Sequence, residues 1–192
     1  TASLPMHLTF AGNSDLGLDV THNYEGFLVK FSPDFVPLWV KHLRSDWPWV
    51  GNPIMGVGGI AIDEDSSAVF VAGSAYDISR TLPINIDSTV IDIHHSRFMF
   101  RFDIDDGRLV SYGKMDYPDT VNSLGPRAIR QQIAAARGRV WFNITFQKGF
   151  TYDDTIFFTP DTNGTSYGEG VVVMDYQGKL IDFIDFRRTI CP

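Results

Sequence analysis

An internal repeat constrains the fold of this chain more than any other feature of its sequence. Three β-rich runs, each followed by a turn and then by an apolar run, resemble one another. The apolar runs open at Leu38, Leu109 and Leu180, and the interval from the first to the second equals the interval from the second to the third. We call this interval the repeat spacing. Because similar segments at a fixed spacing indicate tandem structural units, the repeat predicts the architecture before any local pattern is considered.

Two apolar runs joined by a polar turn also recur. They span residues 60–71 in the first occurrence and residues 133–142 in the second, where the turn is two residues shorter. We expect both segments to form antiparallel hairpins. Residues 8–12 resemble the second run of this pair at 69–73, so we expect the sequence to begin inside a repeat, at its second strand.

Together these runs define a repeat unit of four strands, named A to D in chain order. The pattern predicts one domain over residues 1–192 with about eleven strands: B to D over about 6–45, then A to D over about 57–116 and about 127–187. Local connections favour an antiparallel meander, so the two complete units should be four-stranded sheets packed face to face. The B-to-C connections at 76–96 and 150–169, rich in Asp, Thr, Ser and Pro, are predicted to be loops.

One segment conflicts with the repeat. Residues 128–137 consist of strong helix formers, with Ile129 and Ile133 four positions apart, and in isolation they would be predicted to be helical. The repeat predicts a strand at the same place. We favour the strand, because tertiary context overrides propensity differences of a few tenths of a kcal/mol per residue.

Composition indicates an all-β fold. The chain has 192 residues, of which 44% are hydrophobic. A chain of that length can bury roughly 70% of the surface that its unfolded form exposes. Its 15 Phe, 7 Tyr and 4 Trp, together with 17 Gly and 10 Pro, are typical of short aromatic strands punctuated by turns.

Charge and hydropathy exclude two kinds of partner. The 16 basic and 23 acidic residues give a net charge of −7, so the chain has no basic field with which to bind nucleic acid or anionic lipid. No run of the sequence approaches the roughly 18 consecutive apolar residues of a membrane span. The single cysteine, Cys191, excludes an internal disulfide and leaves open a bond to another chain.

The order of segments resembles a known repeat family. Residues 58–63 read Gly-Gly-Ile-Ala-Ile-Asp, residues 68–74 read Ala-Val-Phe-Val-Ala-Gly-Ser and residues 98–103 read Phe-Met-Phe-Arg-Phe-Asp, while residues 26–31 followed by Leu38-Trp39 match the later part of the unit. This text is similar to the SBBP-type β-propeller repeat. The resemblance, which weakens after about residue 127, implies antiparallel four-stranded blades of β-propeller type in an incomplete, open propeller.

The resemblance also implies a scaffold, because repeats of that family occur in extracellular and cell-surface proteins and share no catalytic residues. A fold alone does not determine function. The turn at 103–109 is similar, more weakly, to the quinoprotein-like propeller repeats, which leaves an enzyme fragment as a third interpretation.

Three aspartates form a candidate calcium loop. Asp103, Asp105 and Asp106 precede Gly107, and carboxylate oxygens from a tight turn are ligands that Ca²⁺ prefers. No Glu follows at the twelfth position of this loop, and the segment coincides with the turn between strands C and D. A glycine-containing β-turn is therefore the favoured interpretation, and the sequence predicts neither a metal nor a cofactor.

Two sequons predict N-glycosylation if the protein is secreted. Asn163 lies in a polar loop and is the better candidate, whereas Asn143 lies in a predicted strand. A glycan on Asn143 would require the face that it shares with Trp141 and Thr145 to look outward.

Aromatic and terminal residues predict contact surfaces. Trp39 and Trp141 are expected to pack between neighbouring units, and Trp47 and Trp49, close together in a D-to-A connection, are expected to form an exposed contact or sugar-stacking cluster. Three further residues complete the predicted assembly contacts: Leu8 and Phe10 in an apolar strand that needs a partner, and Cys191.

These features favour a non-enzymatic extracellular structural glycoprotein, secreted or at the cell surface, whose copies assemble into a filament or surface layer. Fewer than four units cannot close a propeller, and an open propeller leaves edges that invite pairing. The alternative is a carbohydrate- or protein-binding propeller module of a larger secreted protein. No nucleophile elbow, phosphate-binding loop or Cys/His pair in the sequence nominates a catalytic residue.

Overall fold

A computed structural model describes the chain over residues 6–10, 14–20, 26–45, 54–76, 82–93, 96–116, 132–147, 150–152, 155–157 and 167–186. The regular elements there are strands, apart from one short 3₁₀ helix at Glu64–Ser66, and every strand pair is antiparallel. The fold of the described residues is all-β, as the composition predicts.

The strands form four sheets. The N-terminal hairpin pairs β1 (Met6–Phe10) with β2 (Ser14–Val20). The first sheet has the order β3 (Gly26–Phe31), β4 (Pro37–Ser45), β7 (Leu82–Ile86), β8 (Thr89–Ile93). The central sheet has the order β14 (Thr155–Phe157), β13 (Phe150–Tyr152), β10 (Leu109–Asp116), β9 (Ser96–Asp103), β6 (Ala68–Tyr76), β5 (Ile54–Asp63). The last sheet has the order β11 (Ile133–Ala136), β12 (Arg139–Gln147), β15 (Tyr167–Asp175), β16 (Leu180–Asp185).

The predicted strand order A to D occurs twice, as β5-β6-β9-β10 within the central sheet and as β11-β12-β15-β16 in the last sheet. Both predicted hairpins are confirmed, since Ile60 pairs with Val71 and Ile133 pairs with Phe142. The antiparallel pairing between neighbouring strands that the sequence pattern predicts is therefore present in both sheets.

The conflict over residues 128–137 is decided for the part that the structure describes. Residues 133–136 form β11, while 128–131 lie outside the described residues. The backbone of β11 pairs with β12, and Ile133 and Ala135 pack against a hydrophobic core. Pairing and burial thus outweigh the helix propensity of this segment.

The prediction of about eleven strands is wrong. All the predicted segments are strands, but the described residues also contain β2, β7, β8, β13 and β14. Four of these form hairpins inside the B-to-C connections that were predicted to be loops. Apolar residues alternate along β7 and β8, and four isoleucines there are buried, so this hairpin contributes to the core instead of lying on the surface. They are Ile84, Ile86, Ile91 and Ile93.

Each inserted hairpin pairs with the preceding unit and not with its own. Strand β7 lies along β4, with Ile84 opposite Ser45, and β13 lies along β10, with Thr151 opposite Asp116. The residue before Ser45, Arg44, lies opposite Asn85, and both Asn85 and Thr151 are the last residue but one of their strands, so both pairings occur at the same place in the repeat. Each hairpin therefore extends strand D of the unit before it.

The N-terminal hairpin does not pair as the predicted strand B would. In both complete units strand B pairs with strand C, β6 with β9 and β12 with β15, whereas β1 pairs with β2. Along the chain β1, β2 and β3 follow one another as β7, β8 and β9 do, and as β13, β14 and β15 do. Strands β1 and β2 thus take the place of an inserted hairpin. The similarity of 8–12 to strand B misled because both sequences place a glycine after a short, mainly apolar run.

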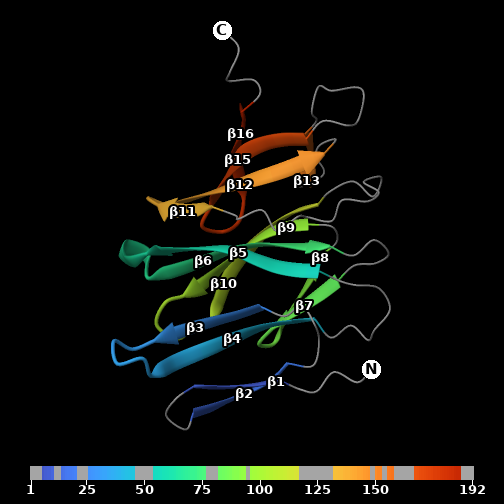
Figure 1. Cartoon of the computed structure of the whole chain (residues 1–192). Helices are drawn as coiled ribbons and strands as arrows, with labels where there is room; N and C mark the ends of the chain where they lie inside the picture. The colour runs from blue at the N-terminus through green and yellow to red at the C-terminus, as the bar shows by residue number, and fades with distance from the viewer. Residues whose placement is uncertain are drawn as a thin grey trace, which may run out of the picture.

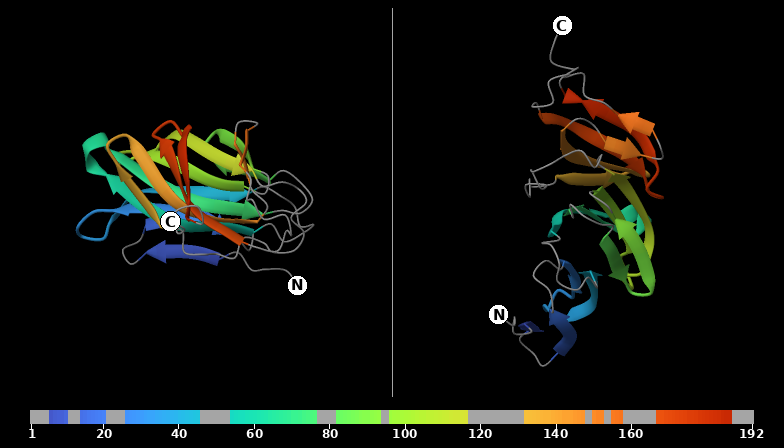
Figure 2. Two further views of the ribbon diagram at one scale, coloured as in Figure 1. Left: turned by 90° about the horizontal axis from the view of Figure 1, so that it is seen from above. Right: turned by 90° about the vertical axis from the view of Figure 1, so that its right-hand side faces the viewer.

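The sheets are stacked face to face. From bottom to top, Figure 1 shows the N-terminal hairpin, the first sheet, the central sheet and the last sheet, and the side view in Figure 2 shows the same order. The N-terminal hairpin and the last sheet consequently lie at opposite ends of the stack.

Two hydrophobic cores fill the spaces between these sheets. Alternate residues of β6 and β9 point to opposite faces, so the central sheet is buried on both sides. The first core, between the first and central sheets, contains Leu28, Leu43, the four isoleucines of β7 and β8, Val69, Val71, Phe98, Phe100 and Phe102. The second core, between the central and last sheets, contains Ala68, Phe70, Ala72, Met99, Met115, Val140, Phe142, Ile144, Val172, Met174 and Tyr176.

Candidate functional site

The turn between β9 and β10 carries the three aspartates of the candidate calcium loop. Gly107 has a φ of 70°, in the left-handed region that favours glycine, and its N–H donates to the Asp103 carbonyl at 2.9 Å. Asp103 Oδ1 accepts the N–H of Asp105 at 2.9 Å, and Asp106 Oδ1 accepts the N–H of Arg108 at 2.8 Å. Two of the carboxylates therefore close the turn, as the turn interpretation predicts.

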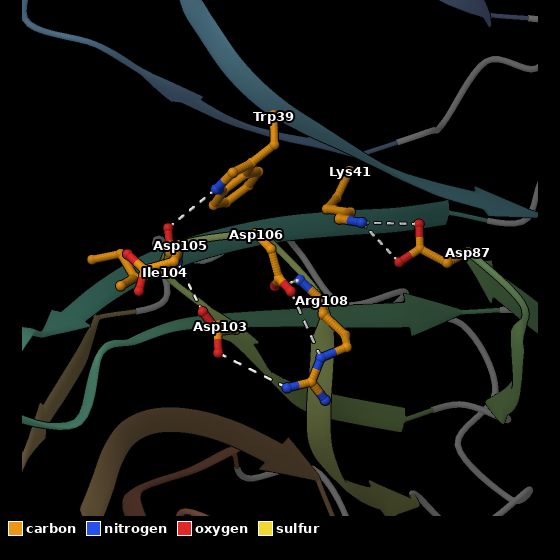
Figure 3. Close-up of polar contacts among 8 residues, drawn as sticks. All are labelled: Trp39, Lys41, Asp87, Asp103, Ile104, Asp105, Asp106 and Arg108. Atoms are coloured by element: carbon orange, nitrogen blue, oxygen red, sulfur yellow. Dashed lines mark hydrogen bonds and ion pairs between the residues drawn. The ribbon is translucent and has the colours of Figure 1, made fainter.

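The same turn docks on the first sheet (Figure 3). The Ile104 carbonyl accepts hydrogen bonds from Trp39 Nε1 at 3.1 Å and from Lys30 Nζ at 2.7 Å. A Cβ built on Gly107 would lie 2.7 Å from Cδ2 of the Trp39 indole, so the turn fits against this ring only with glycine at that position. The prediction that Trp39 packs between neighbouring units is confirmed.

An ion pair holds the inserted hairpin of β7 and β8 against β4 in the first sheet. Lys41 Nζ on β4 lies 2.8 Å from Oδ2 of Asp87, which occupies the turn between β7 and β8 (Figure 3). Asp87 has a φ of 53°, the left-handed conformation that such a tight turn requires and that Asp tolerates. The pair links the hairpin inserted in one unit to strand D of the unit before it.

An equivalent turn joins the last sheet to the central sheet. Gly178 has a φ of 85°, and Asp175 Oδ1 accepts the N–H of Lys179 at 2.8 Å. The Tyr176 carbonyl accepts a hydrogen bond from Ser111 Oγ of β10 at 2.5 Å. The turn after β15 therefore docks on β10 as the turn after β9 docks on β4.

The two docking contacts use the same positions of the repeat. Trp39 precedes its acceptor Ile104 in the chain by the same interval, 65 positions, by which Ser111 precedes its acceptor Tyr176. In each case the carbonyl that follows the turn aspartate accepts a hydrogen bond from strand D of the preceding unit. We name this contact the turn-to-strand junction.

A polar network in the second junction joins residues 113 positions apart. The Tyr176 hydroxyl donates to Asp63 Oδ2, its ring packs on Phe70 with centroids 4.7 Å apart, and the Arg101 guanidinium carbon lies 5.2 Å from the ring centroid. The hydrogen bond from Tyr176, aided by Ser66 and backbone N–H groups, lowers the pKa of Asp63 against the opposing effect of desolvation. Burial and the bond to Asp63 raise the pKa of Tyr176. The sequence holds no local signal for this pair.

The outer face of the last sheet carries large apolar side chains. Trp141 on β12 and Ile184 on β16 point away from the second core, because the adjacent Phe142 and Phe183 pack toward it. The Trp141 side chain is half-buried and Ile184 is 41% exposed. Trp141 occupies the position that Phe70 holds one repeat spacing earlier, and Phe70 is buried against Tyr176 in the second junction.

The first sheet has a matching face on the side away from the central sheet, toward the N-terminal hairpin. Phe27 and Val29 on β3 point away from the first core, which contains the intervening Leu28. Both are half-buried, whereas Phe98 and Phe100, one repeat spacing later, are 0% exposed between two sheets. The outer face of the first sheet thus carries residues that an inner sheet buries.

The other predicted site residues are only partly placed. Asn143 lies on the outer face of β12, and its Oδ1 accepts the N–H of Gln132 at 2.7 Å. Leu8 and Phe10 belong to β1, whose backbone alone is described. The remaining predicted residues, Trp47, Trp49, Asn163 and Cys191, lie outside the described residues.

Within the described ranges, no group of three or more His, Cys, Asp and Glu residues is placed to hold a metal ion. That part of the chain likewise contains no helix of the length and apolarity needed to cross a membrane. Comparisons of the chain with protein-family models, curated proteins and solved structures find no match. The functional interpretation therefore depends on the junctions and on the outer faces of the stack.

Proposed function

We propose that this protein is a non-enzymatic scaffold built from SBBP-type propeller repeats, secreted or held at a cell surface, whose copies associate with one another. The turn-to-strand junction carries the proposal, since it recurs at two successive steps of the stack. A contact that repeats at a fixed spacing can add sheets in one direction without a new kind of interface.

The use of polar side chains supports this proposal. Asp103, Asp106 and Asp175 close turns by accepting backbone N–H groups. Lys30 and Trp39 hold the turn of the next sheet through its carbonyl. These groups stabilise local turns and contacts between sheets, which is the chemistry expected of a scaffold.

Self-association is the test of the scaffold. The molar mass of the purified chain should rise with concentration in sedimentation equilibrium, and electron microscopy should show elongated particles. The association should persist at high salt, because the outer faces are apolar and salt screens charge pairs but not apolar contacts. A mass that stays at one chain over a thousandfold range of concentration would contradict the proposal.

The proposed location predicts a modification. Asn163 in protein from its natural source should carry an N-linked glycan, seen as a mass shift that disappears in Asn163→Gln. Asn143 should be occupied less, because its side-chain oxygen holds the N–H of Gln132 and the residue sits in mid-strand. An unmodified Asn163 peptide from native material would count against secretion through a glycosylating pathway.

A further inference from the structure

We propose that copies of this chain join head to tail, with the N-terminal hairpin of one copy pairing along strand β16 of another. This inference rests on the proposed scaffold function and names the surface through which the scaffold grows. It follows from the hairpin exchange within the chain, from the position of β1 and β2 in the stack, and from the two outer faces.

The first observation is the pairing of each inserted hairpin with the preceding unit, which we call hairpin exchange. At both steps described, the hairpin that precedes strand C of one unit pairs with strand D of the unit before it, β7 with β4 and β13 with β10. Strand β16 is the third strand D and forms the edge of the last sheet as the structure describes it. The exchange therefore predicts a hairpin beside β16 that a further unit must supply.

The N-terminal hairpin is the second observation. Strands β1 and β2 precede strand C of the first unit, β3, and form a two-stranded sheet by themselves. In Figure 1 this hairpin lies one level below the first sheet. Strands β7 and β8 likewise belong to the sheet below the rest of their own unit, because β7 pairs with β4. It occupies the position of an exchanged hairpin, without a strand D beside it in the described part of the chain.

The outer faces are the third observation. Trp141 and Ile184 on the last sheet occupy positions that, one repeat spacing earlier, are held by Phe70 and Gly113, which face the last sheet. Phe27 and Val29 on the first sheet occupy positions that, one repeat spacing later, face a preceding sheet. Stacking the first sheet of one copy on the last sheet of another would bury both faces together. The two half-interfaces differ from each other, so the contact is heterologous and continues from copy to copy.

A second copy would give the last sheet the same strand order as the central sheet. Its N-terminal hairpin would convert the last sheet into a six-stranded sheet of order β2-β1-β16-β15-β12-β11. This is the order that the central sheet already has in β14-β13-β10-β9-β6-β5. The partner is therefore another copy of this chain, whose hairpin and first-sheet face arrive together.

The internal pairing also predicts the register between copies. Arg44 lies opposite Asn85, the fourth of the five residues of β7. In the next step Asp116 lies opposite Thr151, the second of the three residues of β13, so both pairs join strand D to the last residue but one of the hairpin strand. In an antiparallel pair Met115, one residue before Asp116, then lies opposite the last residue of that strand. Phe186 follows Met115 by one repeat spacing, and Phe10 is the last residue of β1. We therefore expect Phe10 of one copy to lie opposite Phe186 of the next, at the separation of about 5.5 Å between Cα atoms that suits a disulfide.

The experiment is disulfide trapping in a Cys191→Ser background. The double variant Phe10→Cys/Phe186→Cys should give a ladder of dimers, trimers and longer species on a non-reducing gel, and reductant should abolish the ladder. The matched control is Phe10→Cys/Ile181→Cys. Ile181 is 47% exposed and Phe186 is 41% exposed on the same segment, but they are separated by about 17 Å of extended chain, so the control should give little ladder.

The outcomes separate this inference from the proposed function. A ladder at least tenfold stronger for the Phe186 pair than for the Ile181 pair supports the head-to-tail contact. Association by sedimentation without a ladder, dimers alone, or equal ladders from both pairs would overturn the head-to-tail contact and leave the scaffold standing. A protein that stays monomeric and gives no ladder would overturn both, and another protein or a further segment of a longer chain would then be the occupant of this edge.

Discussion

Replacing Gly107 with alanine should destabilise the protein more than the same change at Gly138. Gly107 has a φ of 70° and Gly138 a φ of 77°, so both variants incur the cost of placing an L residue in the left-handed region, about 1 kcal/mol. They differ in their surroundings. A Cβ at Gly138 meets nothing within 4 Å, whereas a Cβ at Gly107 lies 2.7 Å and 2.8 Å from two carbons of the Trp39 indole.

The extra cost at Gly107 follows from this contact. Carbon atoms pack best about 3.5–4.0 Å apart, so either the indole or the turn must move by about 1 Å. Such a movement disturbs the hydrogen bond of 3.1 Å from Trp39 Nε1 to the Ile104 carbonyl and the packing of Trp39 against the first core. Overpacking of this kind costs about 1–3 kcal/mol. Gly107→Ala should therefore lose about 2–4 kcal/mol of the free energy of unfolding, against about 1 kcal/mol for Gly138→Ala.

Urea unfolding followed by far-UV circular dichroism measures this difference, with the urea dependence of the unfolding free energy required to stay constant between variants. A double-mutant cycle with Trp39→Ala isolates the cause. Without the indole, Gly107→Ala should cost close to what Gly138→Ala costs, because the group that the new Cβ meets is gone. Equal costs for the two glycines in the parent protein, or additive effects in the cycle, would refute the account of the turn-to-strand junction.

Three more measurements bear on the cores and on the polar network. Phe100→Ala should cost about 3–5 kcal/mol, because the ring is 0% exposed, whereas Phe35→Ala, 82% exposed, should stay within about 0.5 kcal/mol. The pKa of Asp63 is lower in the folded state, so its stabilisation is present above about pH 4 and is lost as the pH falls through the folded pKa. The raised pKa of Tyr176 predicts stabilisation that is present below about pH 10 and lost as the pH rises through the folded pKa. Tyr176→Phe should flatten both dependences and Tyr112→Phe should not; identical acid and alkaline profiles for Tyr176→Phe and the parent protein would contradict both assignments.

Much of the architecture was predictable because it follows from patterns among residues that are close together in the sequence and from their repetition. Alternating apolar residues, turn glycines and the constant repeat spacing locate the strands of both complete units and the turn at Gly107. The segment at Ile133–Ala136 shows the same principle against a contrary signal, since the repeat predicts a strand where propensity predicts a helix. A repeat succeeds here because each unit must present similar faces to similar neighbours.

The inserted hairpins show where this reasoning failed. The segments after Tyr76 and before Tyr167 look like polar loops, and their strands find partners in a different unit, on β4 and β10. The pairing of β1 with β2 was missed for the same reason, because the match of 8–12 to strand B concerns the type of strand and not its partner. The bond between Tyr176 and Asp63 likewise joins positions that are far apart in the chain.

The sequence by itself determined that the chain is all-β, where its repeated strands lie, which turns require glycine, and that Trp39 lies between units. Only the tertiary structure decided which strands are neighbours across units, which aspartates close turns, and which apolar faces remain at the two ends of the stack. The physical reason is the separation along the chain of the residues that decide each feature. Strand formation and turn geometry depend on a few adjacent residues, whereas sheet edges, junctions and outer faces depend on which distant segments meet when the sheets stack.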